Sequence, residues 1–368
     1  MEDYQEYKIK RERILNYLEN KHFEGILLGK YYNFAWATCG ADNRVVKGSE
    51  DGSACILFTP YDTYLIASNI EMPRLEKEEI INSGVKKVSY PWYQQDIAGL
   101  VKRLGVNPEK VKTDTPLPGF ELLPCDFNSL RYQFTPQEIE RYKRLGENTT
   151  KIVEEVCRKI SPGKRELEVA SMVEAELLSS GISPSVLLVG SDERVLNYRH
   201  PLPKEKRIEK YVMIVVCARK KGQVVNLTRC IYFGKVPGWL EERFKAAFFV
   251  DATMIVNSRP GKTLEDVLNK GIKAYQETGY PEEWKAHHQG GITGYREREC
   301  LAMPGCREVI LKSMPLAWNP SIKGAKSEDT IIVGEKGFSY VTFPTSDWPK
   351  AIVEVEEEKI ERADLLRC

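Results

Sequence analysis

The chain has 368 residues, of which 42% are hydrophobic and 29% are charged, a composition typical of a folded protein with room for two domains. Its 54 basic and 53 acidic residues leave a net charge of +1, which argues against nucleic acid or a membrane surface as a partner. The charged N-terminal stretch and the lack of eighteen consecutive apolar residues argue against a signal peptide or membrane span, so we expect a cytoplasmic protein. Nine cysteines, an odd number without a CxxC pair, indicate reduced thiols.

Residues 1–134 are predicted to form a small α/β domain. Apolar side chains share one helical face over residues 4–18, and the GILLG stretch that follows reads as a strand. The runs 53–58 and 63–67 flank a TPYD turn and predict a hairpin. A proline-rich stretch, residues 115–134, has little periodicity and is predicted to be a loop that closes the domain.

Residues 135–368 are predicted to form a second domain. Thr135, Pro136 and Glu138 combine an N-cap, a proline at the first helical position and a capping-box glutamate. Two amphipathic helices, a hairpin around Lys220-Lys221-Gly222, two further helices and a set of strands follow in that order. Their predicted ranges are 136–160, 164–180, 211–218, 223–233, 238–257, 263–278, 314–320, 329–333 and 338–343. The fold class is therefore α+β overall.

This order of elements resembles the pita-bread family of creatinase, prolidase, aminopeptidase P and methionine aminopeptidase. The stretches NFAWATCGADNRVV and YLIASNIEMPRL are similar to the N-terminal domain of creatinase and aminopeptidase P. The HHQGG and KSEDT segments fall where that family has its histidine–glycine stretch and its late glutamate strand. The resemblance covers nearly the whole chain and implies a creatinase-type N-terminal domain followed by a pita-bread domain.

Family peptidases hold two metal ions with two Asp on the hairpin, one His and two Glu. The matching positions here are Val215, Asn226, His288, Asn319 and Glu328, with the neighbouring His287 a poorer match than His288. Val215 and Asn226 are equidistant from the turn expected near Lys220-Lys221, which predicts that they face one another. Valine offers no ligand and asparagine only a neutral oxygen, so we expect no metal pair and no cofactor. Weak binding of a single ion is left open.

The resemblance to creatinase implies that such a site could work without metal. Creatinase uses a histidine as its general acid–base group. The matching residue is His200, in NYRHPLP. We expect His200 and His288 to move protons and Glu328 to hold an imidazole or the attacking water. A structural alternative pairs Glu328 with Lys323 or Lys326. Thr228 stands where creatinase has a glutamate, which argues against creatine as the substrate.

Five residues are candidates for substrate binding. Asn226 and Asn319 are expected to donate N–H groups to a substrate oxygen. Tyr295 and Arg296 follow the histidine pair, where an arginine can clamp a carboxylate. Arg44, in GADNRVV, resembles a loop residue that reaches the partner's site in creatinase-like dimers, which implies a homodimer.

Three functions are compatible with these residues. The leading hypothesis is a creatinase-like, metal-independent hydrolase that acts on a C–N bond of a small molecule or short peptide. The second is a non-catalytic binding or scaffold relative, because a fold does not carry its function with it. The third is an Xaa-Pro aminopeptidase or dipeptidase with unusual metal ligands.

Overall fold

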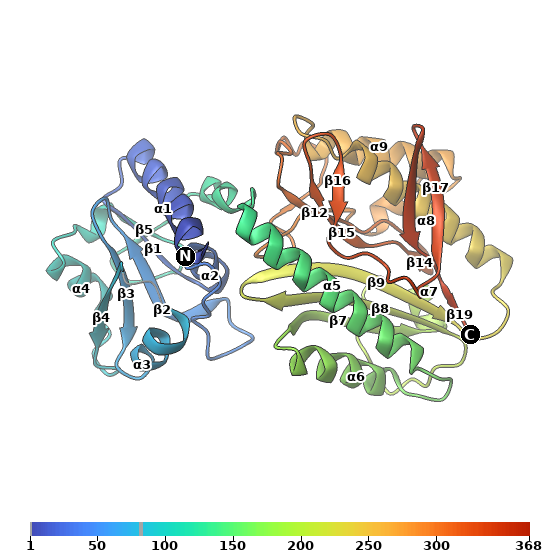
Figure 1. The fold of residues 1–368 in the computed structure, drawn as a ribbon, viewed down its shortest axis with the longest axis horizontal. Coiled ribbons are helices and arrows are strands. Elements are labelled where there is room, and N and C mark those ends of the chain that lie inside the picture. The colour runs from blue at the N-terminus through green and yellow to red at the C-terminus, as the bar shows by residue number, and fades with distance from the viewer. Residues whose placement is uncertain (1, 81–83) are drawn as a thin grey trace. The chain divides into compact units, whose positions relative to one another are not determined.

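The computed structural model describes residues 2–80 and 84–368, which divide into two units (Figure 1). The first unit is Met1–Arg131 with Lys221–Gln223, and the second is Tyr132–Lys220 with Val224–Cys368. Among the described residues, no helix is both long enough and apolar enough to cross a membrane.

A six-stranded mixed sheet with the order β4-β3-β2-β1-β5-β6 forms the first unit. Helix α4 packs on one face of this sheet through Leu100 and Val101, which contact Leu27, Leu57 and Ile66. The predicted N-terminal helix, first strand and hairpin are confirmed. The stretch predicted as a loop over 115–134 also contains a short strand, β6, and a 3-10 helix, η3. The elements are α1 (Glu2–Lys21), β1 (Gly25–Lys30), α2 (Tyr31–Ala37), β2 (Asp51–Phe58), β3 (Thr63–Ser68), α3 (Met72–Arg74), η1 (Leu75–Glu79), β4 (Val85–Tyr90), α4 (Ile97–Arg103), η2 (Pro108–Lys110), β5 (Val111–Thr113), β6 (Glu121–Leu122) and η3 (Cys125–Arg131).

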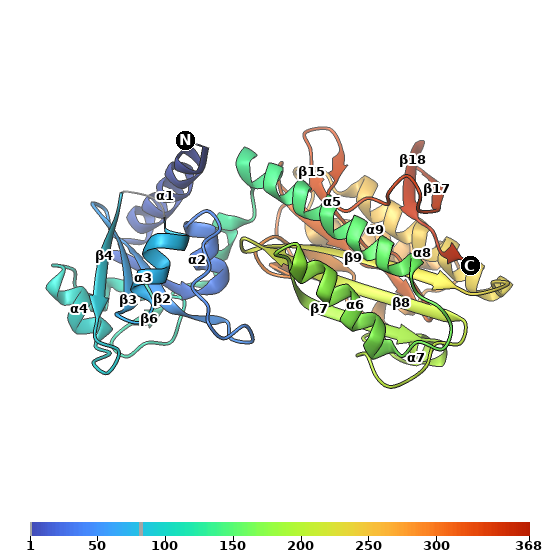
Figure 2. The same ribbon diagram turned by 60° about the horizontal axis from the view of Figure 1, so that its bottom comes forward.

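The second unit is built on a four-stranded sheet, β19-β9-β8-β7, and a five-stranded sheet, β11-β10-β12-β15-β16. Helices α5 and α6 run along the four-stranded sheet in both views (Figures 1 and 2). The predicted helix start at Thr135 is confirmed, with both halves of its capping box formed. The elements are α5 (Pro136–Arg158), α6 (Glu166–Ser179), β7 (Ser183–Ser191), α7 (Glu193–Asn197), β8 (Tyr211–Lys220), β9 (Gln223–Tyr232), α8 (Gly238–Asn257), α9 (Leu264–Glu277), η4 (Glu283–Ala286), β10 (Gly290–Ile292), β11 (Cys300–Leu301), β12 (Pro315–Trp318), β13 (Ser321–Ile322), β14 (Ala325–Lys326), β15 (Asp329–Val333), β16 (Phe338–Tyr340), β17 (Lys350–Val355), β18 (Glu358–Ala363) and β19 (Leu366–Arg367).

Helix α8 joins the cores of the two sheets. Its residues Phe244 and Phe248 pack with Met213 and Val215 of β8 in one apolar cluster. Further along α8, Val250 and other residues join α9 and the five-stranded sheet in a second cluster. Burial of these side chains contributes about 25 cal/mol for each Å² of apolar surface removed from water.

Buried ion pairs connect α5, β9 and β15 behind the four-stranded sheet. Arg229 donates to Glu154 at 2.7 Å and to Asp329 at 3.1 Å, and all three side chains are at most 1% exposed. Burial of charged side chains this deep in the protein is costly unless each one is paired. Loss of one partner therefore leaves an uncompensated charge behind.

We expect Arg229→Met to lower the free energy of unfolding by about 3–5 kcal/mol, because it leaves buried Glu154 without a cationic partner and Asp329 with Arg362 alone. Arg144→Met is the matched control, since Arg144 pairs with Glu140 on the exposed face of α5 and should contribute below about 0.5 kcal/mol. Urea unfolding followed by circular dichroism measures both. Equal, small losses in the two variants would contradict the role given to the buried pairs.

Candidate functional site

The pairing of β12 with β10 and β15 brings several of the predicted site residues to one end of the five-stranded sheet. Because Trp318 pairs with Asp329, Asn319 and Glu328 occupy the next position beyond that pair. The backbone N–H of Asn319 donates to the carbonyl of Gln289 at 3.1 Å, which brings the histidine pair to the same end.

Strand β9 connects the other sheet to this point. The backbone N–H of Thr228 donates to the carbonyl of Glu328 at 3.0 Å, and the Thr228 hydroxyl donates to the Glu328 carboxylate at 2.7 Å. Asn226 lies two residues earlier, so its side chain is on the same face of β9. The two sheets are therefore joined at the site itself.

The turn between β8 and β9 lies within the predicted segment Lys220-Lys221-Gly222. Lys221 and Gly222, with φ values of 49° and 79°, form a two-residue turn of the type that favours tight hairpins. Pairing continued from that turn places Val215 opposite Thr228, not opposite Asn226. In this register Val215 and Asn226 lie diagonally across the hairpin, two residues apart, and their side chains share one face.

Two cationic side chains hold the carboxylate of Glu328. Lys326 Nζ lies 2.8 Å from Glu328 Oε2, and Arg298 Nη2 lies 3.0 Å from Glu328 Oε1. The side chains of Glu328, Lys326 and Arg298 are 2%, 4% and 13% exposed. Burial alone would raise the pKa of Glu328, but Lys326, Arg298 and the Thr228 hydrogen bond lower it to about 2. The alternative that paired Glu328 with Lys326 is confirmed, and the predicted contact of Glu328 with an imidazole is replaced by these bonds.

Three histidines form a cluster next to this ion group. His200 follows α7 in a loop, whereas His287 and His288 lie between η4 and β10. His200 Nε2 and His287 Nε2 are 3.0 Å apart, and the rings of His287 and His288 stack with their centroids 4.4 Å apart. His200 is exposed, His287 is buried and His288 is intermediate. At 3.0 Å one of the two Nε2 atoms donates and the other accepts, so one N–H proton lies in this contact.

The surroundings keep all three imidazoles neutral near pH 7. Burial lowers the pKa of His287 to about 2, with a further contribution from the charge of Lys326. Burial and Arg298 lower the pKa of His288 to about 4. Burial and Lys326 lower the pKa of His200 as well. A neutral imidazole can accept a proton, which is the state that a general base requires.

Both asparagines have a side-chain oxygen without a partner among the described residues. Asn226 Nδ2 donates to Thr293 Oγ1 at 2.9 Å, and Thr293 in turn donates to the carbonyl of Arg296 at 3.1 Å. The chain of donors fixes the amide orientation and uses one of the two Nδ2 hydrogens, so the N–H donation expected of Asn226 stays a prediction. Among residues 2–80 and 84–368, no partner satisfies Asn226 Oδ1 or Asn319 Oδ1, although both side chains are at most 2% exposed.

The side chains of the remaining three substrate-binding candidates are more buried, or more fully bonded within the chain, than predicted. Tyr295 is fully buried, and its hydroxyl donates to Glu138 at 2.7 Å, so it anchors the start of α5 in place of lining a pocket. Arg296 is partly exposed. Within the first unit, Arg44 binds Asp42 through two nitrogens and lies over the ring of Tyr31.

Two residues that carry the charge of the site lie outside the five substrate-binding candidates. Arg298 belongs to the run of polar residues after the histidine pair that could complete the pocket, and Lys326 is predicted only as an alternative partner of Glu328. A signal for Lys326 exists, because Lys326 and Glu328 are two residues apart and an extended chain places both on one face. Arg298 reaches the site from a turn, where periodicity gives no direction.

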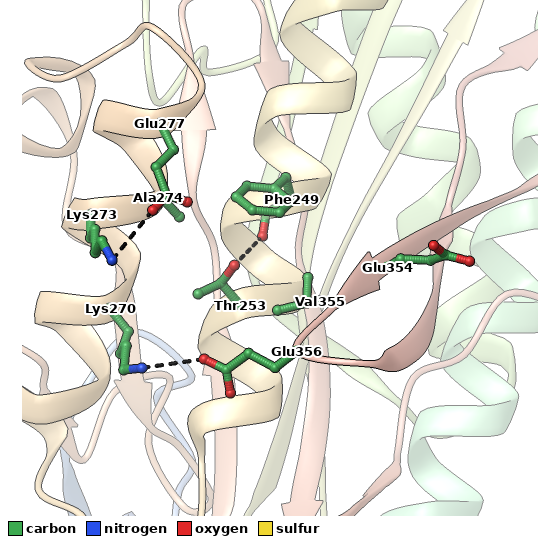
Figure 3. Close-up of a pocket in the computed structure, with 9 residues that line it drawn as sticks. All are labelled: Phe249, Thr253, Lys270, Lys273, Ala274, Glu277, Glu354, Val355 and Glu356. Atoms are coloured by element: carbon green, nitrogen blue, oxygen red, sulfur yellow. Dashed lines mark hydrogen bonds and ion pairs between the residues drawn. The ribbon is translucent and has the colours of Figure 1, made fainter.

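A separate cavity of about 280 Å³ lies between α8, α9 and the β17–β18 hairpin (Figure 3). Its lining includes Phe249, Thr253 and Val355, with an ion pair between Lys270 and Glu356 at 3.2 Å across one side. None of the predicted site residues lines this cavity. The histidine and ion-pair cluster is therefore the candidate site.

The fold and this site define a class of protein. Residues 140–335 match the model of metallopeptidase family M24, so the chain belongs to that family, whose members hydrolyse C–N bonds of peptides. The resemblance to the creatinase, aminopeptidase P and prolidase family is thereby confirmed.

Known relatives cover almost the whole chain. The Xaa-Pro dipeptidase of Pyrococcus furiosus is 22% identical over 91% of this chain and 98% of its own length. Among solved structures, an Xaa-Pro dipeptidase from Bacillus anthracis has a TM-score of 0.79 and 21% identity, over 98% of this chain and 100% of that one. The N-terminal domain of the FACT complex subunit SPT16 from chickpea has a TM-score of 0.70 and 13% identity, over 93% and 97%. The predicted α+β pita-bread fold is confirmed.

The family name implies metal ions, and the residues present do not fit a pair of them. Val215 offers no donor atom, Asn226 and Asn319 offer neutral oxygens, and Glu328 already binds two cationic side chains. Two divalent ions need several carboxylates to bridge and neutralise them. Lys326 and Arg298 add positive charge where that neutralisation would be required.

The histidine cluster predicts a loss of stability in acid. The folded-state pKa of His287 lies far below its unfolded value of 6.5, so its contribution is present above pH 6.5 and is lost as the pH falls. Between pH 6.5 and 5 the loss from His287 alone is about 2 kcal/mol, at about 1.4 kcal/mol per pH unit.

Urea unfolding at pH 7.0 and 5.0 measures this effect. His287→Gln, which cannot titrate, should lose about 2 kcal/mol less than the unsubstituted chain over that interval. His22→Asn is the control, since His22 is exposed and its φ of 57° suits asparagine. An equal loss in the His287→Gln variant would refute the assignment of a buried, neutral His287.

Proposed function

We propose that this chain hydrolyses a C–N bond of a small molecule or short peptide without a metal pair, in the manner of creatinase. Membership of the M24 family supports hydrolysis of a C–N bond as the reaction. One contact supports a histidine as the group that transfers the proton. That contact is the 3.0 Å approach of His200 Nε2 to His287 Nε2, which couples an exposed imidazole to a buried neutral one.

The reaction follows from the protonation state of this pair. Neutral His200 takes a proton from water as the water oxygen bonds to the substrate carbon. The C–N bond then breaks, and the same proton passes to the leaving nitrogen, so the imidazole returns to its neutral state. His287 orients the ring of His200 through the Nε2 contact, and His288 stacks behind His287.

Charge at the site favours the oxygen that becomes negative during this addition. Lys326 and Arg298 carry two positive charges and Glu328 one negative charge, which leaves a net charge of +1. Fixed positive charge in a water-poor site stabilises a developing oxyanion. In this proposal the cationic side chains take over the electrostatic role that metal ions have in the peptidases.

The buried amide oxygens suggest how the substrate is held. Asn226 Oδ1 and Asn319 Oδ1 need N–H donors, and an amide, amidine or amine nitrogen supplies them. This role stands beside the expected donation of N–H groups to a substrate oxygen by these residues. A substrate with N–H groups beside the scissile C–N bond fits both the asparagines and the cationic pair.

A substrate screen on metal-stripped protein tests the proposal. Amidines, ureas, lactams and Xaa-Pro dipeptides are the probes, with turnover measured before and after treatment with chelator. We expect activity to survive the chelator and to fall at least about 100-fold in kcat in His200→Ala, with His22→Asn unchanged. Activity that disappears with chelator and returns with manganese would instead identify a metallopeptidase with unusual ligands.

A binding module is the second candidate. This candidate is supported by the contacts of Glu328. Its carboxylate forms salt bridges with Lys326 and Arg298 and accepts a hydrogen bond from Thr228, an arrangement that is stable without a substrate. A fold shared with a FACT complex subunit is consistent with it. No turnover of any probe class, with tight binding of one of them, would favour this candidate.

Pairing of two chains is also part of the proposal. The GADNRVV loop of the first unit resembles the loop that reaches the partner's site in creatinase-like dimers. Sedimentation velocity at micromolar concentration should give a single species of twice the 42.1 kDa chain mass. A monomer across that concentration range would exclude a contribution of Arg44 to a neighbouring site.

A further inference from the structure

The three histidines are placed like the ligands of a single ion. One ring nitrogen from each of His200, His287 and His288 lies within 4.8 Å of one from each of the others. Zinc–nitrogen bonds of about 2.0–2.1 Å in tetrahedral geometry put ligand nitrogens about 3.3 Å apart. The His200–His287 distance of 3.0 Å already meets that spacing. Because His200 is exposed in a loop, small side-chain rotations can close the remaining distances.

Unused ring nitrogens supply a second, independent observation. Among the described residues, no partner is within hydrogen-bond distance of His287 Nδ1 or His288 Nδ1, although both atoms are buried. His287 is 8% exposed as a whole residue. A buried polar atom without a partner destabilises the fold, and an ion bound to His288 Nδ1 would offset this cost for His288. His287 would bind the same ion through Nε2, the atom that approaches His200.

We propose that His200, His287 and His288 form a site for one transition-metal ion of the zinc class. Three neutral imidazoles without a carboxylate suit zinc, cobalt, nickel or copper, whereas magnesium, calcium and manganese require oxygen ligands. Of these three residues, only His288 matches a position in the family's metal pair. The site is therefore different in composition from a binuclear peptidase centre, and it holds one ion.

An ion at this site would use the lone pairs that proton transfer requires. This consequence rests on the proposed function: one equivalent of zinc should slow the hydrolysis, and chelator should restore it. The response is opposite to that of a metallopeptidase. The test below measures zinc binding and needs no turnover. Its failure would therefore be distinguishable from failure of the hydrolase proposal.

Equilibrium dialysis of tag-free, chelator-treated chain against zinc tests the site. We expect one equivalent to bind per chain, with at least a 10-fold loss of affinity in His200→Ala and in His287→Gln. Cobalt should give the visible absorption of a tetrahedral ion without a thiolate charge-transfer band. His200→Ala removes an exposed side chain, so its melting temperature without metal should match that of the unsubstituted chain.

Two control variants keep the result interpretable. His22→Asn removes the fourth histidine and should bind zinc with unchanged affinity. Cys306→Ser tests the rival thiol pair, since Cys300 Sγ and Cys306 Sγ are 3.7 Å apart, and it should also leave binding unchanged. Zinc binding that persists in His200→Ala and His287→Gln, or no binding by the unsubstituted chain, would overturn the proposal.

Discussion

The salt bridges of Glu328 with Lys326 and Arg298 determine what the rest of the site can do. In the family's peptidases a carboxylate at this position serves metal ions, and here two buried cationic side chains bind both of its oxygens. Burial lowers the pKa values of His287 and His288, the charges of Lys326 and Arg298 lower them further, and the same charges oppose the approach of a divalent pair. Together with Val215, Asn226 and Asn319, these salt bridges leave a site that does not fit a pair of divalent ions.

Much of the fold follows from local sequence signals. The capping box at Thr135 and the proline that follows it predict where α5 begins, and the period of apolar residues predicts α5, α6, α8 and α9. Strand β7 is not among the predicted elements, although Gly181 marks the end of α6, because the first half of SPSVLLVGS is only partly buried and contains a proline and two serines. The turn at Lys221 and Gly222 depends on two positive φ values, and apolar period alone does not locate these.

The site was less predictable than the fold, because its chemistry depends on contacts distant in sequence. Matching by spacing indicated which ligand positions had changed, at Val215, Asn226 and Asn319. It did not reveal that Asn226 donates to Thr293 and so offers its oxygen, nor that Arg298 turns inward from a charged run. The contact of His287 with His200 joins residues 87 positions apart, which no local pattern specifies.

A crystal structure of the chain grown with excess manganese, with anomalous data, tests the central claim most directly. The account predicts no anomalous peak within about 3 Å of the Glu328 carboxylate, whose oxygens should remain in hydrogen-bond contact with Lys326 and Arg298. Two manganese peaks about 3.5–4 Å apart and bridged by Glu328, with Lys326 displaced, would contradict it.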